Sequence, residues 1–250
     1  MPLRPVHEHP WDLTPGAARA LQAELAGRVE PADRFETIEL VAGIDVGFEQ
    51  GGTLARAAIA VLRLPDLTPV DQAIARRNAD FPYVPGLLSF REIPAVLDAL
   101  ATLRTSPQLL VCDGQGLAHP RRFGLACHLG WILDAPCIGV AKSRLIGSFA
   151  DPEQQRGAAT PLRHDDEVIG AALRSRVGAK PVFVSIGHRV GLASAIALAM
   201  ACTGDYRLPE TTRHAHRLAS SRLGLESQGE AGGPEAEAGQ APSRFAIGDR

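Results

Sequence analysis

The sequence has no apolar run of the roughly 18–20 residues that a membrane-spanning helix needs. Its first residues, MPLRPVHEHPWDL, contain no apolar segment of the kind found in secretory signal peptides. We therefore expect a cytoplasmic protein that does not bind a membrane. The four cysteines form no CxxC motif, which disfavours a disulfide framework and a structural zinc site. They are Cys112, Cys127, Cys137 and Cys202.

Lysine is almost absent, since only Lys142 and Lys180 occur among the 26 Lys and Arg residues. In a chain that otherwise carries its positive charge on arginine, a lysine indicates a position that requires a compact donor. The alternative is that the two lysines occur where they do by chance. The formal net charge of -2 gives no sign of a nucleic-acid partner, although a local basic patch can still bind phosphate.

The end of the chain differs in composition from the rest. From Leu225 to Arg250 there are five acidic residues against two arginines, and the stretch SQGEAGGPEAEAGQAPS has no large apolar residue to bury. This composition is typical of disorder. We predict a single folded domain over 1–224, with an N-terminal helix, and a disordered acidic, Gly/Ala-rich tail over 225–250.

Short apolar runs alternate with helical patterns through the body of the chain, which predicts an α/β sheet covered by helices on both faces. Strands are expected at 38–44, 57–64, 109–112, 137–141 and 181–186. Helices are expected at 13–29, 92–104, 121–133, 191–202 and 210–222. The closely spaced β segments at 38–48, 54–64 and 69–79 indicate an antiparallel meander, and we expect the later strands to extend the sheet in parallel.

Four of the apolar runs end at a residue with functional chemistry. These residues are Asp45, Asp113, Lys142 and His188. Ligands of open α/β sheets bind at the carboxyl ends of parallel strands, so two carboxylates and an ammonium there indicate a site for a divalent metal and an anionic oxygen. The alternative is that each Asp only begins a turn after its strand.

A Pro-stiffened loop at Pro82–Pro85 carries Tyr83, one of only two tyrosines. A rigid loop with an aromatic tip favours a wedge that enters a base stack, whereas the alternative is a tight, packed turn. The following Ser89 and Glu92 match the S-x-x-E capping box, and local patterning favours capping for Glu92.

Basic residues occur at two expected helices. The motif His119-Pro120-Arg121-Arg122 begins the helix at 121–133, where it indicates either a phosphate site or a solvated helix start. On the last helix, His214 and His216 are two residues apart, so they point in different directions and are not expected to bind the same metal.

Six segments together resemble the endonuclease V family, and they cover about residues 38–217 in the family's order and spacing. Long matches at six places are far more specific than one short motif. The segments are VAGIDVGFEQGG (41–52), PYVPGLLSFRE (82–92), VCDGQGLAHPRRFG (111–124), IGVAKSRLIG (138–147), GHRV (187–190) and YRLPETTR (206–213). The resemblance implies an RNase H-like fold, with a mixed five-stranded core sheet in which the two aspartate strands are neighbours.

The resemblance also implies roles for individual residues. Asp45, Glu92 and Asp113 correspond to the ligands of Mg²⁺, for which Mn²⁺ is expected to substitute, and this overrides capping for Glu92. Lys142 and His216 correspond to further catalytic positions. Residues of the wedge and of the lesion pocket, together with the basic motif, are expected to contact DNA: Pro82, Tyr83, Val84, Pro85, Gly86, Gly114, His119, Arg121 and Arg122. Where this chain has DGQG the family often has DGHG or DGNG, so Gln115 is not expected to be catalytic.

The activity implied is repair of deaminated adenine in DNA. The family cleaves the second phosphodiester on the 3′ side of deoxyinosine and leaves 3′-hydroxyl and 5′-phosphate ends. Two alternatives remain, namely an inosine-directed ribonuclease and a non-catalytic lesion-binding module. The second is disfavoured because Asp45, Glu92 and Asp113 are all present. Nothing in the sequence indicates an obligate protein partner.

Overall fold

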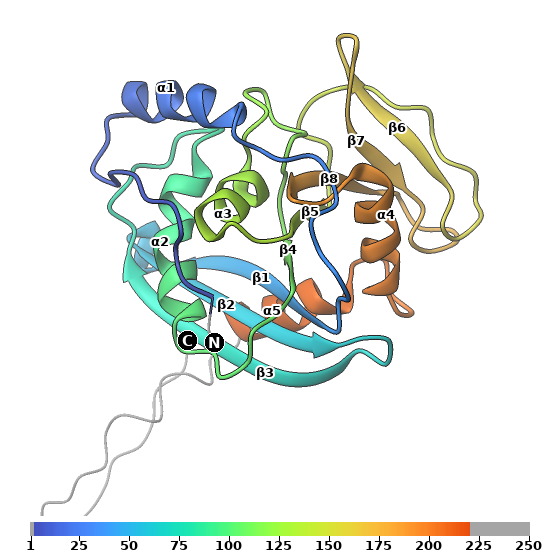
Figure 1. Ribbon diagram of the computed structural model, residues 1–250, viewed down its shortest axis with the longest axis horizontal. Coiled ribbons are helices and arrows are strands. Elements are labelled where there is room, and N and C mark those ends of the chain that lie inside the picture. The colour runs from blue at the N-terminus through green and yellow to red at the C-terminus, as the bar shows by residue number, and fades with distance from the viewer. Residues whose placement is uncertain (1–2, 221–250) are drawn as a thin grey trace, which may run out of the picture. The chain divides into compact units, whose positions relative to one another are not determined.

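The computed structural model describes residues 3–220, so the tail predicted at 225–250 lies outside the described residues. One mixed sheet forms the centre of this part of the chain, with helices on both of its faces (Figure 1). The helices are α1 (Pro15–Ala26), α2 (Leu88–Leu100), α3 (Leu125–Leu133), α4 (Leu192–Ala201) and α5 (Glu210–Ser220), with a short 3-10 helix at Gln50–Gly52. Among residues 3–220 no helix is long and apolar enough to cross a membrane.

The sheet has eight strands in the order β3-β2-β1-β4-β5-β8-β7-β6. They are β1 (Leu40–Glu49), β2 (Leu54–Arg63), β3 (Thr68–Asn78), β4 (Leu109–Cys112), β5 (Cys137–Ala141), β6 (Ala159–His164), β7 (Glu167–Leu173) and β8 (Val182–His188). The first three form the predicted antiparallel meander, and β4 and β5 continue it in parallel to β1. These five adjacent strands are the mixed core expected, and the two aspartate strands β1 and β4 are neighbours.

The far side of the sheet differs from the prediction. Strand β8 pairs antiparallel with β5, and the hairpin of β6 and β7 extends the sheet beyond it. A parallel crossover normally contains a helix, but the connection between β5 and β8 contains this hairpin instead. The hairpin escaped the sequence analysis because Pro161 and the Gly170-Ala171-Ala172 run have low strand propensity.

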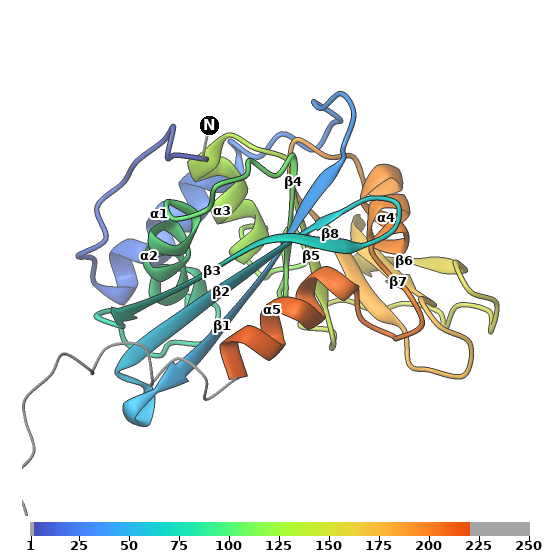
Figure 2. The ribbon, with the colours of Figure 1, turned by 90° about the horizontal axis from the view of Figure 1, so that it is seen from below.

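Alternate residues of the central strands face opposite sides of the sheet and build two separate cores. On β1, Ala42 and Ile44 pack with α1, α2 and α3, whereas Val41 packs on the side that holds α4. Helix α5 also lies on that second side, across β1 and β2 (Figure 2). The expected coverage of both faces is therefore confirmed.

Helix boundaries follow local chemistry where the sequence provides a cap. Helix α1 begins as predicted, with Pro15 at its first turn and the Thr14 hydroxyl accepting from the N–H of Ala17 at 3.2 Å. Helix α3 begins at Leu125 and not at residue 121, because the preceding segment forms a turn in which Arg122 has a φ of 54°. Helix α2 likewise begins at Leu88, four residues before the position expected.

Candidate active site

Asp45 and Asp113 lie side by side because their strands are parallel neighbours. Ile44 on β1 is paired with Cys112 on β4, and the backbone N–H of Asp113 donates to the carbonyl oxygen of Ile44 at 3.1 Å. Strand β1 continues past Asp45 to Glu49 because its other neighbour, β2, is longer than β4. The two aspartates thus meet at the carboxyl edge of the parallel strands, as the sequence predicts.

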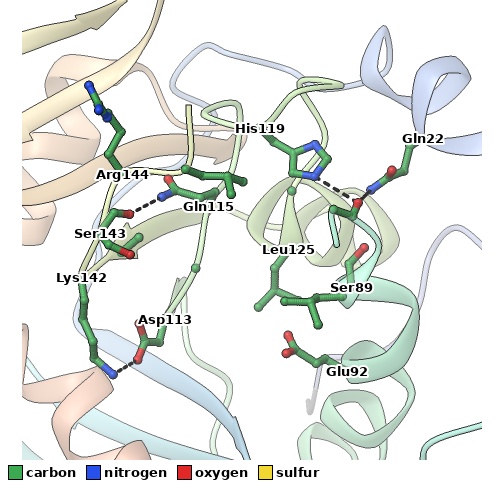
Figure 3. Close-up of a pocket in the computed structure, with 16 residues that line it drawn as sticks. Gln22, Ser89, Glu92, Asp113, Gln115, His119, Leu125, Lys142, Ser143 and Arg144 are labelled. Carbon is green, nitrogen blue, oxygen red and sulfur yellow. Dashed lines mark hydrogen bonds and ion pairs between the residues drawn. The ribbon is translucent and has the colours of Figure 1, made fainter. Parts of the chain in front are cut away.

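Lys142 follows β5 directly and belongs to the same edge. Its Nζ lies 2.6 Å from Oδ2 of Asp113. The ammonium is therefore held against one of the two carboxylates, which places a positive charge within the expected metal site (Figure 3).

Helix α5, which lies on the same face of the sheet as α4, supplies a histidine to the site. Nδ1 of His216 lies 2.8 Å from Oδ2 of Asp45. Burial lowers the pKa of His214, and the positive charge of Arg217 on the same helix lowers it further. His216 is thus the histidine in contact with Asp45, and its catalytic role stays a prediction.

The contact between His216 and Asp45 depends on a close approach of α5 to the sheet. A Cβ at Gly43 would lie 2.1 Å from the carbonyl carbon and oxygen of Thr211, and 2.6 Å from the nitrogen of Thr212. Only glycine therefore allows the first turn of α5 to rest on the β1 backbone, two residues before Asp45.

Glu92 approaches the aspartates from α2. Burial raises its pKa to about 8, and the negative charges of Asp45 and then Asp113 contribute further. It does not act as a helix cap, since the cap position of α2 is Leu87 and makes no side-chain cap hydrogen bond. The Ser89 hydroxyl, expected to complete the capping box, instead lies 3.0 Å from Nδ1 of His128. The capping prediction for Ser89 and Glu92 was wrong.

The donor set fits a hard divalent cation such as Mg²⁺. Burial and then the negative charges of Asp45 and Asp113 favour the protonated form of Glu92, and a bound cation would offset the repulsion between these groups when all three are ionised. Among residues 3–220, no group of three or more potential metal-binding side chains is already gathered around one point. The positive charges of Lys142 and, when protonated, His216 are the neighbours of the aspartates in this conformation.

His188 does not join this site, which corrects the expectation that all four strand ends meet. It ends β8, which is antiparallel to β5, so His188 is paired with Cys137 at the beginning of β5. Its Nε2 lies 3.3 Å from Asp134 Oδ1, and its Nδ1 accepts from the backbone N–H of Glu30 at 3.2 Å. These contacts connect loops at the amino-terminal end of the parallel strands, away from the aspartates.

A pocket of about 340 Å³ lies beside the carboxylates (Figure 3). Its walls come from α1, the start of α2, the loop after β4, the start of α3 and the loop after β5. Gln115 is one wall residue, with its Nε2 donating to the carbonyl oxygen of Ser143 at 3.0 Å. The lining residues are Gln22, Gly86, Leu88, Ser89, Glu92, Asp113, Gly114, Gln115, His119, Gly124, Leu125, Ala141, Lys142, Ser143, Arg144 and Leu145.

Tyr83 projects from the Pro82–Pro85 loop with 69% of its surface exposed. Pro82 and Pro85 are also exposed, whereas Val84 packs partly against the cluster around Phe90. The exposure of the ring argues against a packed turn, which was the alternative to a wedge. The loop ends at Gly86, one of the pocket residues.

The basic motif is engaged with the protein itself. His119 is buried and its ring Nε2 lies 3.1 Å from the carbonyl oxygen of Gly86, while Arg121 Nη2 donates to the same oxygen at 2.7 Å. Arg122 Nε donates to Glu167 on β7 at 2.7 Å. Because α3 begins only at Leu125, the arginines do not form a helix N-terminus, and their contacts with DNA stay a prediction.

Gln22 on α1 is a pocket residue that the sequence analysis missed. It is fully buried although glutamine is usually exposed, and it shares the buried face of α1 with Ala18 and Leu25. A polar residue on an otherwise apolar helix face was the available signal.

Comparison with known proteins agrees with this geometry. A family model described as Endonuclease V matches residues 23–217. The endonuclease V of Roseiflexus castenholzii is 56% identical over 218 residues, covering 87% of this chain and 97% of that protein.

Solved structures have the same fold. The endonuclease V of Streptomyces avermitilis matches with a TM-score of 0.80 at 47% identity, over 88% of this chain and 96% of that one. The endonuclease V of Ciona intestinalis, in complex with a 23mer DNA containing an inosine followed by a ribo-adenosine, matches with a TM-score of 0.72 at 26% identity, over 83% of this chain and 97% of that one. The fold is thus the RNase H-like fold of these proteins, and the chain belongs to the endonuclease V family.

Proposed function

We propose that this protein is a Mg²⁺-dependent endonuclease that recognises deoxyinosine in DNA and hydrolyses the second phosphodiester on its 3′ side. The observation that carries the proposal is the placement of Asp45 and Asp113 at the ends of neighbouring parallel strands, with Lys142 in contact with Asp113. Glu92 lies close enough for the negative charges of both aspartates to raise its pKa, and Glu92 and Asp113 line the pocket. The products would carry 3′-hydroxyl and 5′-phosphate ends, and Mn²⁺ would replace Mg²⁺.

The pocket is suited to a base that has left the helix. Its volume of about 340 Å³ lies within the roughly 300–1,000 Å³ of small-molecule sites. Gly86 and Gly114 line it, but the N–H of Gly114 already donates to the carbonyl oxygen of Cys112 at 2.9 Å. Gly114 therefore contributes shape to the pocket in this conformation, and a preference for the C6 carbonyl of hypoxanthine requires other donors.

A second hollow of about 330 Å³ supports the separation of the lesion from the bond that is cut. Asp113 and Lys142 line both hollows, so they stand between them. The second hollow is otherwise lined by Leu208, Thr212, Arg213, His216 and Arg217. Its basic side chains suit the phosphate backbone, while the first hollow would hold the base.

The chain's own residues divide the chemistry between them. Asp45, Glu92 and Asp113 would hold the divalent cation, which supplies an activated water and offsets charge on the phosphoryl group. Lys142 donates hydrogen bonds to phosphate oxygens from its ammonium nitrogen. His216, held by Asp45 at Nδ1, presents Nε2 as the atom that accepts or donates a proton.

The test compares four matched strands, which are DNA and RNA with inosine or adenosine at the same position. Each is incubated with no metal, with Mg²⁺ and with Mn²⁺, and the products are mapped on denaturing gels. We expect metal-dependent cleavage of inosine DNA at one position 3′ of the lesion. Equal cleavage of adenosine DNA would rule out lesion recognition, and faster cleavage of inosine RNA would favour the ribonuclease. Binding without cleavage in any metal would favour the lesion-binding module.

A further inference from the structure

Three side chains donate hydrogen bonds to one backbone oxygen, the carbonyl oxygen of Gly86. Two of them, Gln22 and His119, are labelled in Figure 3. The donor distances are 3.1 Å from Gln22 Nε2, 3.1 Å from His119 Nε2 and 2.7 Å from Arg121 Nη2. The Nδ1 atom of His119 accepts from the N–H of Arg121 at 3.2 Å, so the ring proton lies on Nε2. We call these three side chains the Gly86 clamp.

Gln22 connects the members of the clamp. It is only 1% exposed, and its Nε2 also donates to the carbonyl oxygen of Phe123 at 3.0 Å. Its Oε1 accepts from Nε of Arg121 at 2.6 Å. Both ends of this one amide are thus used, and it fixes Arg121 at the same time as Gly86. Buried amides with all of their partners in place hold their surroundings in one arrangement.

The backbone of Gly86 is adapted to the clamp. Its φ of +78° is in the left-handed region, and a Cβ there would lie 2.8 Å from Nη2 of Arg121. The glycine therefore allows the turn and leaves room for the guanidinium. It directly follows the exposed Pro82–Pro85 loop, whose other end is anchored by the buried ring of Phe81.

We propose that Gln22 is a positioning residue of the lesion site, which makes α1 a part of lesion recognition. The clamp holds the end of the Pro82–Pro85 loop in place before DNA binds, so Tyr83 is presented at a fixed position against the duplex. A loop that is already ordered loses less conformational entropy when it enters the base stack. This inference rests on the proposed function, because it assigns Gln22 a role in recognising the same substrate.

The test replaces Gln22 with methionine, which keeps the length and apolar volume of the side chain but removes its three hydrogen bonds. We expect Gln22→Met to weaken binding of an inosine duplex about tenfold, equivalent to the loss of one or two net hydrogen bonds. Binding of the same inosine strand without its complement should change much less, because little stacking has to be broken there.

Leu25→Ala is the matched control on the same helix. Leu25 is 4% exposed in the core and is no member of the clamp, so this variant should lower the melting temperature without changing the ratio of duplex to single-strand affinity. In a Tyr83→Ala background, Gln22→Met should have little further effect on duplex binding, because both changes act through the same loop.

Three results would overturn the proposal: unchanged duplex binding by Gln22→Met, equal losses on both substrates that follow the melting temperature as in Leu25→Ala, or full additivity with Tyr83→Ala. If Gln22→Met does not fold, Gln22→Glu tests the donor half of the amide, since it retains an acceptor for Arg121. The same duplex-selective loss is expected, and its absence is equally decisive. Failure of the unmodified protein to prefer inosine over adenosine duplexes would instead remove the proposed function.

Discussion

The ammonium nitrogen of Lys142 lies 2.6 Å from Oδ2 of Asp113, and these two side chains stand between the two hollows of the site. The ion pair therefore has two competing effects. It places a positive charge where a phosphate would lie, and it also lowers the attraction of Asp113 for a cation.

Lys142→Met should separate these effects. Cleavage of inosine DNA should fall at least about a hundredfold, because a charged donor to the phosphate is lost. Binding of Mn²⁺ to the protein without DNA should become a few-fold tighter, since an exposed ion pair contributes about 1 kcal/mol or less. Mn²⁺ titration and single-turnover kinetics measure the two quantities. Weaker Mn²⁺ binding would contradict the competition, and Lys180→Met is the control for the loss of a lysine.

Asp45→Ala and Asp113→Ala should each abolish cleavage and largely preserve the fold. In the metal-free protein each variant removes a negative charge that disfavours ionisation of Glu92, so no large loss of stability is expected. Cleavage with Mg²⁺ and the melting temperature are measured together. Asp98→Ala, which removes the partner of Arg77 on the surface, should cleave normally. Near wild-type cleavage by either site variant would show that the metal assignment is wrong.

Tyr83→Ala should weaken binding to inosine duplexes by roughly ten- to a hundredfold, because stacking on an aromatic ring contributes about 1–3 kcal/mol. The ring is 69% exposed, so the melting temperature should hardly change. Saturating enzyme should still cut at the same bond, and the defect should shrink on single-stranded substrate. Tyr83→Phe keeps the ring and should bind normally. Equal losses on both substrates, together with a lowered melting temperature, would exclude the wedge.

Acid should destabilise the contact between His9 and His128, whose Nε2 atoms lie 2.6 Å apart. Burial lowers the pKa of both, and for His128 the nearby His9 lowers it further. The unfolded chain then binds more protons below a pH of about 6.5, so this stabilisation is present above that pH and is lost as the pH falls. The slope is at most about 1.4 kcal/mol per pH unit for each histidine.

Melting temperatures between pH 8 and pH 5 check this expectation. His128→Gln should be less stable than the unmodified protein at pH 8 but should show a shallower dependence on pH. His164→Gln, on the partly exposed β6–β7 hairpin, controls for the removal of a histidine. Equal slopes for His128→Gln and the unmodified protein would show that the buried pair does not control acid stability.

The sequence predicted the parts of the site that depend on neighbouring strands. Asp45, Asp113 and Lys142 follow apolar runs, and the side-by-side arrangement of parallel strands brings such ends together. The same pattern predicted that His188 joins the site. This prediction was wrong, because the direction of β8 depends on the connection before it and not on the residues of β8.

Tertiary hydrogen bonds account for most of what local patterns did not predict. Ser89 and Glu92 match a capping box, but the hydroxyl of Ser89 turns to His128, which is far away in the sequence. Arg121 has the appearance of a phosphate ligand at a helix start, yet its partners are Gln22 and Gly86. These partners are distant in the sequence, so a local sequence pattern does not predict them.

Gly43 has no side chain, and this determines the distance between His216 and Asp45 although Gly43 itself is not part of the site. With no carbon between β1 and the Thr211 carbonyl, α5 lies low enough on the sheet for His216 to reach Asp45. A Cβ at this position would clash with the Thr211 carbonyl, so the helix would have to move and carry the imidazole away from the carboxylate. The contact between His216 and Asp45 is thus set by the thinness of the β1 backbone at Gly43 and not by a ligating side chain.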